Sequence, residues 1–271
     1  MLSVRGMFNR KLVGCLIAFM LAACEPEATP LPVDIVPTTP AIPTQATAQP
    51  VRYAIDASLF SVMLPEQVES IAASGEIESV TPPFLDDDLG NRYDVLIALG
   101  SLPDATDSPT LLTISLGLNT ALAPLDDAAI AEVVRRAIRT DGIAAALGIA
   151  GVEALPHVSE TAQTLRTSLA NAGLPDGFDL SMASLYATGA DVIAEQLAVI
   201  GIETRVTPMN TDEANDLGAY HLILFGSYAQ PLVTNVDGVE IIDLLRVPIS
   251  VRTVPDLTIE FTDDGLPLVQ R

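Results

Sequence analysis

The first fifty residues differ in character from the rest of the chain, and they decide where a folded domain can begin. Three basic residues lie within the first eleven positions, and the following stretch 12–20 is apolar without a charge. The run Leu21-Ala22-Ala23-Cys24 comes next. A basic region, a short apolar core and small residues, in this order, are typical of a secretory signal. The apolar core is about half as long as a membrane-spanning helix, so we expect no permanent span here.

The cysteine that ends this run resembles the lipobox of bacterial lipoproteins. The resemblance implies cleavage before Cys24, diacylation of its side chain and an extracytoplasmic protein anchored by lipid to the cell membrane. We therefore expect residues 1–23 to be a lipoprotein signal peptide. An ordinary signal sequence in which Cys24 has no special role is the alternative. Two acyl chains would hold a soluble domain stably, whereas one chain binds a membrane only marginally.

Residues 24–50 have the composition of a tether. Prolines recur there between Thr, Ala and Gln, at positions 26, 30, 32, 37, 40, 43 and 50. Such a segment favours extended geometry and has too little apolar surface to offset the entropy of ordering. We therefore expect the folded part to run from Val51 to Arg271, which is long enough for one medium domain or two lobes.

Charge and cysteine content narrow the possible partners. The net charge is −22, and every acidic residue follows Cys24, so cleavage would make the chain still more negative. Lys11 is the only lysine, which leaves arginine as the one strongly basic residue type of the mature chain. Nucleic acid is excluded as a partner because binding needs basic residues that neutralise phosphates. Both cysteines, Cys15 and Cys24, lie in the signal region, so the domain offers no disulfide.

From Val51 onward, β-like runs alternate with helical ones, which predicts an α/β fold with a mixed or parallel sheet. The nearly continuous apolar run Tyr93–Leu99 indicates a strand buried on both faces. Asp126 is the expected cap of a helix that carries Ile130, Val134 and Ile138 on one face. Further strands are expected at 51–55, 77–80, 111–118, 178–183, 203–207, 220–225, 247–253 and 257–261, and further helices at 65–74, 159–173 and 190–200, with a short turn at 143–147.

Several motifs follow one another in the order found in a known family. Asn119-Thr120 and Asp126-Asp127 precede the expected helix that ends near Ile138. The next helix is followed by Ala-Gly-Leu-Pro-Asp-Gly-Phe at 172–178, which leads into a strand. The helix after that ends in Gln-Leu-Ala-Val-Ile-Gly-Ile at 196–202. Residues 118–226 thereby resemble the second lobe of solute-binding proteins of bacterial ABC importers, family 5. Val51–Ser58 and the strand after Gly90 are similar to the first lobe of type 2 periplasmic binding proteins.

The resemblance implies a two-lobed type 2 periplasmic-binding-protein-like fold with a reduced first lobe, because members of the family are usually longer. We expect lobe 1 from residues 51–120 and 229–271, and lobe 2 from residues 121–228. The resemblance also implies capture of a small-molecule or peptide solute between hinged lobes, with an ABC permease as partner. His221 and Ser227 stand where the family has Asp and Trp, so peptide binding is not carried over.

Signatures of an enzyme are nearly absent from the sequence. The domain has no cysteine nucleophile and no Gly-x-Ser-x-Gly motif. Its histidines, His157 and His221, have no partners that the sequence identifies for a catalytic triad or a metal site. The run 86–88 of three aspartates lacks the spacing of a calcium loop and is expected to be a solvated turn. We therefore expect neither an enzyme nor a bound cofactor or metal.

The expected ligand-binding residues follow strands or precede a helix, where polar groups of an α/β fold converge. Ser101 follows the strand at 93–99, and Asn119 lies at the expected crossing between the lobes. Tyr186 precedes a helix, and Ser227 and Tyr228 end the last strand of lobe 2. Ordinary loop structure is the alternative for each of them. The two tyrosines are favoured because aromatic residues make up only 4% of the chain.

Two functions remain open. The first is a lipid-anchored solute-binding protein that serves an ABC importer. The second is a degenerate lipoprotein that keeps the fold for an interaction or sensing role without transport. The shortened first lobe and the replaced Asp and Trp favour the second function, whereas the retained motifs of the second lobe favour the first.

Overall fold

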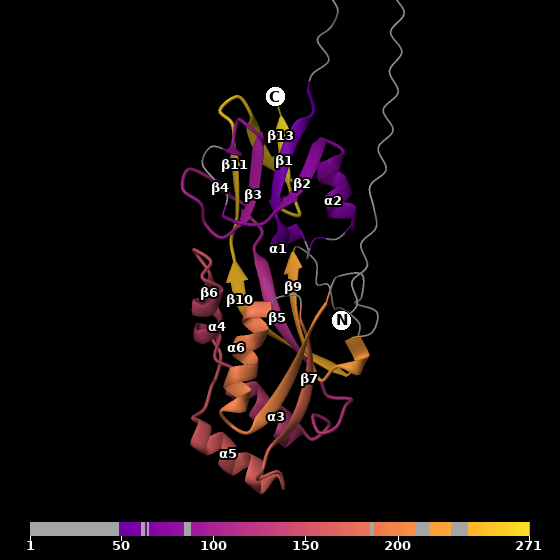
Figure 1. Cartoon of the computed structure of the whole chain (residues 1–271), viewed down its shortest axis with the longest axis vertical. Coiled ribbons are helices and arrows are strands. Elements are labelled where there is room, and N and C mark those ends of the chain that lie inside the picture. The colour runs from indigo at the N-terminus through magenta and orange to yellow at the C-terminus, as the bar shows by residue number, and fades with distance from the viewer. Residues whose placement is uncertain are drawn as a thin grey trace, which may run out of the picture. The chain divides into compact units, whose positions relative to one another are not determined.

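The computed structural model describes residues 49–60, 63, 65–83, 88–184, 187–209, 217–228 and 238–270 (Figure 1). Ala48–Arg271 forms one compact unit, distinct from Met1–Thr47. The predicted signal peptide, Cys24 and the tether up to residue 48 lie outside the described residues. Among the helices that the structure describes, none is long and apolar enough to cross a membrane.

The first lobe is built around a five-stranded mixed sheet with the strand order β2-β1-β3-β11-β4. β1 runs parallel to β2 and β3, whereas β11 runs antiparallel to β3 and β4. Two short helices connect β1 to β2, and a separate hairpin follows β11. The elements are β1 (Val51–Asp56), α1 (Ala57–Phe60), α2 (Pro65–Ala72), β2 (Gly75–Val80), β3 (Val95–Leu99), β4 (Thr106–Asp107), β11 (Ile249–Thr253), and the hairpin of β12 (Thr258–Phe261) and β13 (Pro267–Gln270).

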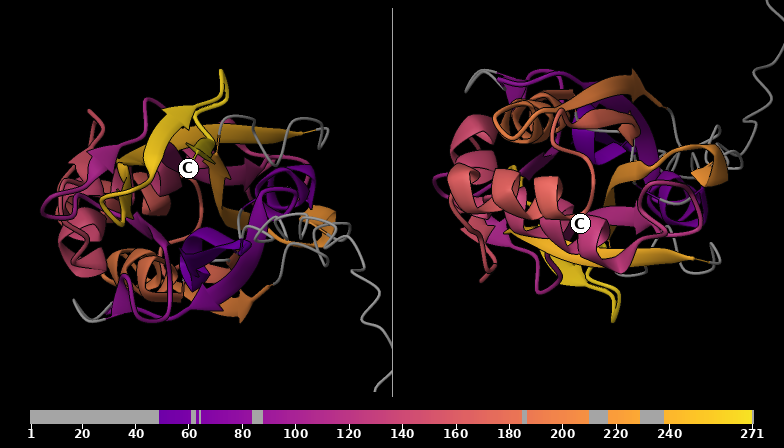
Figure 2. Two further views of the ribbon diagram at one scale, coloured as in Figure 1. Left: turned by 90° about the horizontal axis from the view of Figure 1, so that it is seen from above. Right: turned by 90° about the horizontal axis from the view of Figure 1, so that it is seen from below.

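The second lobe is built around a six-stranded sheet with the order β6-β10-β5-β9-β7-β8. β7 runs parallel to β8 and β9, and β5 runs antiparallel to β9 and β10. Its helices pack against one another as well as against the sheet (Figure 2). The elements are β5 (Leu112–Asn119), α3 (Ala128–Ala137), α4 (Thr140–Leu147), β6 (Glu153–Ala154), α5 (Ala162–Asn171), β7 (Phe178–Ser184), α6 (Ala187–Ala198), β8 (Ile202–Pro208), β9 (Leu222–Tyr228) and β10 (Val239–Val247).

The core confirms the two strongest patterns in the sequence. All five residues of β3 are buried, as expected for a strand covered on both faces. Helix α3 buries its apolar stripe of Ile130, Val133 and Val134. Its cap is Asp127 rather than the expected Asp126, because the Asp127 carboxylate accepts a hydrogen bond from the backbone N–H of Ala129 at 2.8 Å.

Two segments that we expected in lobe 1 belong to the sheet of lobe 2. β5 and β10 pair with each other there, and β5 pairs with β9 on its other side. Seven of the eight residues of β5 are buried, which fits an interior strand of the larger sheet that is covered on both faces. The rest of the tail differs: β11 lies in the first sheet, and among the described strands β12 pairs with β13 alone.

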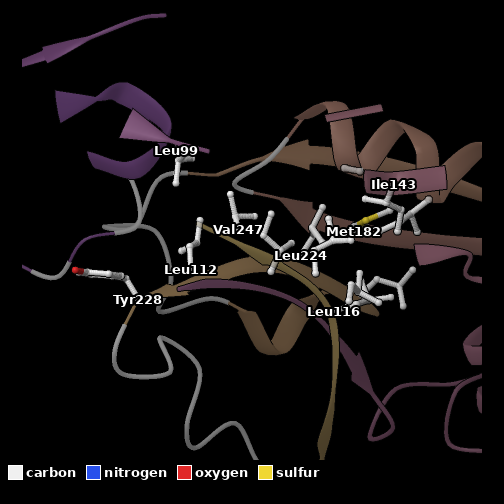
Figure 3. Close-up of a cluster of buried hydrophobic side chains, with 14 of the residues drawn as sticks. Leu99, Leu112, Leu116, Ile143, Met182, Leu224, Tyr228 and Val247 are labelled. Atoms are coloured by element: carbon white, nitrogen blue, oxygen red, sulfur yellow. The ribbon is translucent and has the colours of Figure 1, made fainter. Parts of the chain in front are cut away.

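The chain crosses between the two sheets at two adjacent places. Residues 108–111 lead from β4 to β5, and Pro248 alone separates β10 from β11. The expected strand 247–253 is therefore split at Pro248, which has no backbone N–H to donate. Because Leu112 pairs with Val247, the two crossings lie side by side. One buried apolar cluster continues through them, from Leu99 past Leu112 and Val247 to Leu224 (Figure 3).

Candidate functional site between the lobes

The carboxyl ends of the parallel strands in both sheets lie at the crossing. Tyr228, the last residue of β9, pairs with Leu112 at the start of β5. β7 and β8 run in the same direction as β9, so they end at the same edge of the second sheet (Figure 1). In the first sheet, Leu99 at the end of β3 pairs with Ile249, directly after Pro248. The carboxyl ends of the parallel strands of both sheets therefore meet at the crossing, and α/β proteins bind ligands at such strand ends.

Ser101 lies at this meeting place, as its position after β3 predicts. Its backbone N–H donates to the carbonyl of Ala150 in lobe 2 at 2.9 Å. The preceding Gly100 has φ +89°, and a Cβ there would lie 2.6 Å from Ile149. The Gly100 N–H donates to the carbonyl of Pro248 at 2.7 Å. A loop of lobe 2 thus rests on the end of β3, and the Ser101 side chain remains exposed beside it.

Tyr228 also lies at the crossing, but it is part of the core. Its side chain is 3% exposed, and burial raises the pKa of its phenol. The hydroxyl donates to the carbonyl of Gly265 at 2.5 Å, and the Tyr228 carbonyl accepts from Gln67 Nε2 at 3.3 Å. Side chains alternate along a strand, so the half-buried Ser227 points to the opposite face of the sheet. The structure therefore assigns Tyr228 internal partners.

Asn119 does not lie at the crossing between the lobes, which corrects that expectation. It ends β5 at the side away from Leu112, because β5 belongs wholly to the second sheet. Its Nδ2 donates to the carbonyls of Gly218 and Tyr220, and its Oδ1 accepts from the Ala121 N–H at 3.1 Å. Asn119 is 2% exposed and holds the turn that follows β5. Tyr186 lies outside the described residues.

Asp56 is a residue of this edge that the sequence analysis did not single out. It ends β1, is 5% exposed, and its Oδ1 accepts from the Ser58 N–H at 2.8 Å. Burial raises the pKa of this carboxyl group, although hydrogen bonds from the backbone of Ser58 and Leu99 oppose the shift. A polar residue at the end of an otherwise apolar strand is the signal that points to it.

A cavity of about 360 Å³ lies at the opposite edge of the second sheet, at the amino ends of β7 and β8. Ser181 and His221 line it, with Asp179, Glu203 and Arg205. The Ser181 hydroxyl and backbone N–H lie 2.8 and 3.2 Å from His221 Nδ1, and His221 Nε2 lies 3.1 Å from the carbonyl of Ala123. These contacts fasten the start of β9 to β7.

His157 lines a second cavity of lobe 2, of about 280 Å³. Its Nε2 lies 2.8 Å from the carbonyl of Arg135 at the end of α3, so the ring has a structural partner. Within the described part of the chain, no three His, Cys, Asp or Glu side chains come close enough together to hold a metal ion.

No family model matches this chain, and no curated protein is similar to it in sequence. Solved structures are similar in fold. The dipeptide-binding protein of Pseudoalteromonas sp. SM9913 in complex with Met-Leu superposes with a TM-score of 0.50 at 12% identity, over 71% of this chain and 57% of that one. HbpA2 from Haemophilus parasuis gives a TM-score of 0.49 at 12% identity, over 71% and 57%. DppA from Helicobacter pylori, with a bound peptide, gives 0.45 at 18% identity, over 56% and 36%.

The Pseudoalteromonas structure defines the class of fold. The chain has the two-lobed periplasmic-binding-protein fold, as the sequence predicts, with a reduced first lobe. It spans less than two thirds of the length of each of these three proteins.

Proposed function

We propose that this protein is a lipid-anchored extracytoplasmic solute-binding protein, which holds a small solute between its lobes for an ABC importer. The observation that carries the proposal is that the carboxyl ends of the parallel strands of both sheets meet where the chain crosses twice between the lobes, at residues 108–111 and at Pro248. Two lobes joined in this way can turn about the crossings and enclose a ligand at the strand ends. The fold shared with a dipeptide-binding protein supports the same function.

The proposed ligand contacts are Ser101, Tyr186 and Ser227. Ser101 follows β3, Tyr186 lies in the sequence between β7 and α6, and Ser227 belongs to the end of β9. Tyr228 is not among them, because its hydroxyl and carbonyl already have partners inside the protein. A ligand held by the closed lobes would contact side chains from both sheets, which is the condition for a ligand to favour the closed state.

The test is calorimetry of Ala48–Arg271 with amino acids, short peptides, sugars and divalent metals, beside a melting-temperature screen. We expect one class of solute to release heat and raise the melting temperature. Tyr186→Ala should weaken its binding roughly tenfold, since a buried aromatic contact contributes about 1–2 kcal/mol. Tyr220→Ala is the control, because Tyr220 lies just before the start of β9, near Asn119 and away from Tyr228. Binding that survives Tyr186→Ala but not the control would move the site elsewhere.

A second function is favoured by a separate observation. Tyr228 is buried at the place where a ligand contact was expected, and its polar atoms are satisfied within the protein. A tyrosine that is already bonded inside the protein at this position favours a protein that keeps the fold for an interaction or sensing role without transport. If no solute releases heat or shifts the melting temperature, this second function replaces the first. An ABC permease that copurifies with the full-length protein would support the first.

A further inference from the structure

Three segments that are distant in the sequence meet at the carbonyl group of Gly265. Its oxygen accepts a hydrogen bond from the Tyr228 hydroxyl at 2.5 Å and from Ser108 Oγ at 2.9 Å. Tyr228 ends β9 of lobe 2, Ser108 begins the first crossing, and Gly265 lies in the turn between β12 and β13. Tyr228 and Ser108 are 3% and 5% exposed. Both bonds are therefore shielded from water, so breaking them leaves buried polar groups without partners.

The turn that contains Gly265 fits closely onto the crossing. Gly265 has φ +78°, and a Cβ there would lie 2.4 Å from Thr110 Oγ1 and 2.9 Å from Ser108 Oγ. The Gly265 N–H donates to the Thr262 carbonyl at 2.8 Å, which closes the turn. The backbone conformation and the space both require glycine, because any side chain would push the turn away from residues 108–110.

A second segment of lobe 1 holds the same end of β9. Gln67 of α2 is 6% exposed, and its Nε2 donates to the Tyr228 carbonyl at 3.3 Å. The turn after β12 follows the first sheet, and α2 precedes β2 of that sheet. Elements associated with lobe 1 therefore bind Tyr228, the last residue of a lobe 2 strand, at both its hydroxyl and its carbonyl.

We propose that residues 262–266 form a hinge lock, which fixes the two lobes in the arrangement of this structure through Tyr228 and Ser108. Rotation about the crossings must part these hydroxyl groups from the Gly265 carbonyl. The C-terminal hairpin thereby controls how readily the lobes move. The hinge motion itself rests on the proposed function, but the lock is a property of the protein without ligand.

Two spin labels, one on each lobe, test the lock. The full chain would carry Cys15→Ser and Cys24→Ser, with new cysteines at the exposed Glu76 of β2 and Gln163 of α5. Pulsed electron paramagnetic resonance then measures the distance between the labels without any ligand. We expect one narrow distance distribution for this parent protein, and a broader distribution or a second distance for Tyr228→Phe and for Gly265→Ala.

Matched controls separate the lock from a general loss of stability. Tyr53→Phe also removes a buried hydroxyl, whose hydrogen bond to Ser74 at 2.8 Å lies within lobe 1. Gly173→Ala also places a side chain at positive φ, +87°, but with nothing within 4 Å. Both controls should keep the parent distribution.

Hydrogen exchange gives a second readout. The N–H of Thr110 donates to Ser108 Oγ at 3.1 Å, and the N–H of Ser108 donates to the carbonyl of Ile249 at 2.7 Å. We expect these amides to exchange about fivefold faster in Tyr228→Phe, as the loss of one hydrogen bond predicts, and unchanged in Tyr53→Phe. Ser108→Ala replaces Tyr228→Phe if that variant does not fold. Parent-like distances and exchange in the lock variants would overturn the proposal, whether or not a solute binds.

Discussion

Asp56 is a buried carboxylic acid whose ionisation opposes folding. Burial raises its pKa above the ordinary value, so the folded protein binds this proton more tightly than the unfolded chain does. Protonated Asp56 therefore contributes favourably to the stability of the folded state. This contribution is complete below the ordinary pKa of an aspartic acid, and it is lost as the pH rises through the pKa of Asp56 in the folded protein. An amide at this position avoids the loss and can still accept from the Ser58 N–H.

We therefore expect Asp56→Asn to gain stability relative to the parent as the pH rises from about 3 to 7, within the range in which carboxyl groups titrate. Urea unfolding at a series of pH values measures the difference. Asp141→Asn should behave in the opposite way, because a hydrogen bond from Arg139 lowers the pKa of Asp141. Its contribution is present at neutral pH and lost on acidification. A constant difference between Asp56→Asn and the parent would refute the burial argument.

Single residues show where sequence reasoning succeeds and fails. Ser101 lies near the end of β3, as expected, because a polar residue after an apolar run marks the end of a strand. Tyr228 lies at the end of β9, as expected, but its partner Gly265 is 37 residues away, and no local sequence pattern predicts that contact. Asn119 was misplaced because its position depends on the sheet to which β5 belongs. Long-range pairing decides the role of a polar side chain.

At the scale of elements, the start of α3 offers a test with a built-in control. The Asp127 carboxylate accepts from the Ala129 N–H, whereas Asp126 beside it is exposed and its backbone N–H donates to the carbonyl of Leu122. Loss of a helix cap costs about 1 kcal/mol. Asp127→Ala should therefore lower the free energy of unfolding by about this amount, and Asp126→Ala should change it little. Equal effects in thermal or urea unfolding would contradict the assignment of the cap.

Most elements could be predicted because each has a local periodic signal. β3 is a continuous apolar run, and α3 has a regular apolar stripe. No strand was expected at 239–246, so most of β10 was missed. The lobe of β5 could not be predicted, because both lobes accept strands of similar composition and only the pairing partner decides. The two-residue strands β4 and β6 are too short to carry a pattern.

The predicted anchor concerns the molecule as a whole. If Cys24 carries lipid, Cys24→Ser should release the protein from the membrane fraction into the soluble fraction, because two acyl chains supply the binding. Cys15→Ser is the control, since residue 15 lies in the apolar core of the predicted signal and would be removed on cleavage. Immunoblots of separated fractions and the mass of the mature N-terminus measure the result. A mature chain without lipid that starts elsewhere would rule the anchor out.

The outermost strands of the two sheets affect whether copies of this protein associate with one another. Within the part of the chain that the structure describes, β2 and β8 are outermost strands, each paired on one side. β2 presents exposed Glu76 and Glu78, and β8 presents Glu203 and Arg205. Two copies that approached through β2 would bring carboxylates together and strip them of water. If the proposed lipid anchor holds many copies on one membrane surface, the carboxylates of β2 would oppose pairing between neighbouring copies through this strand.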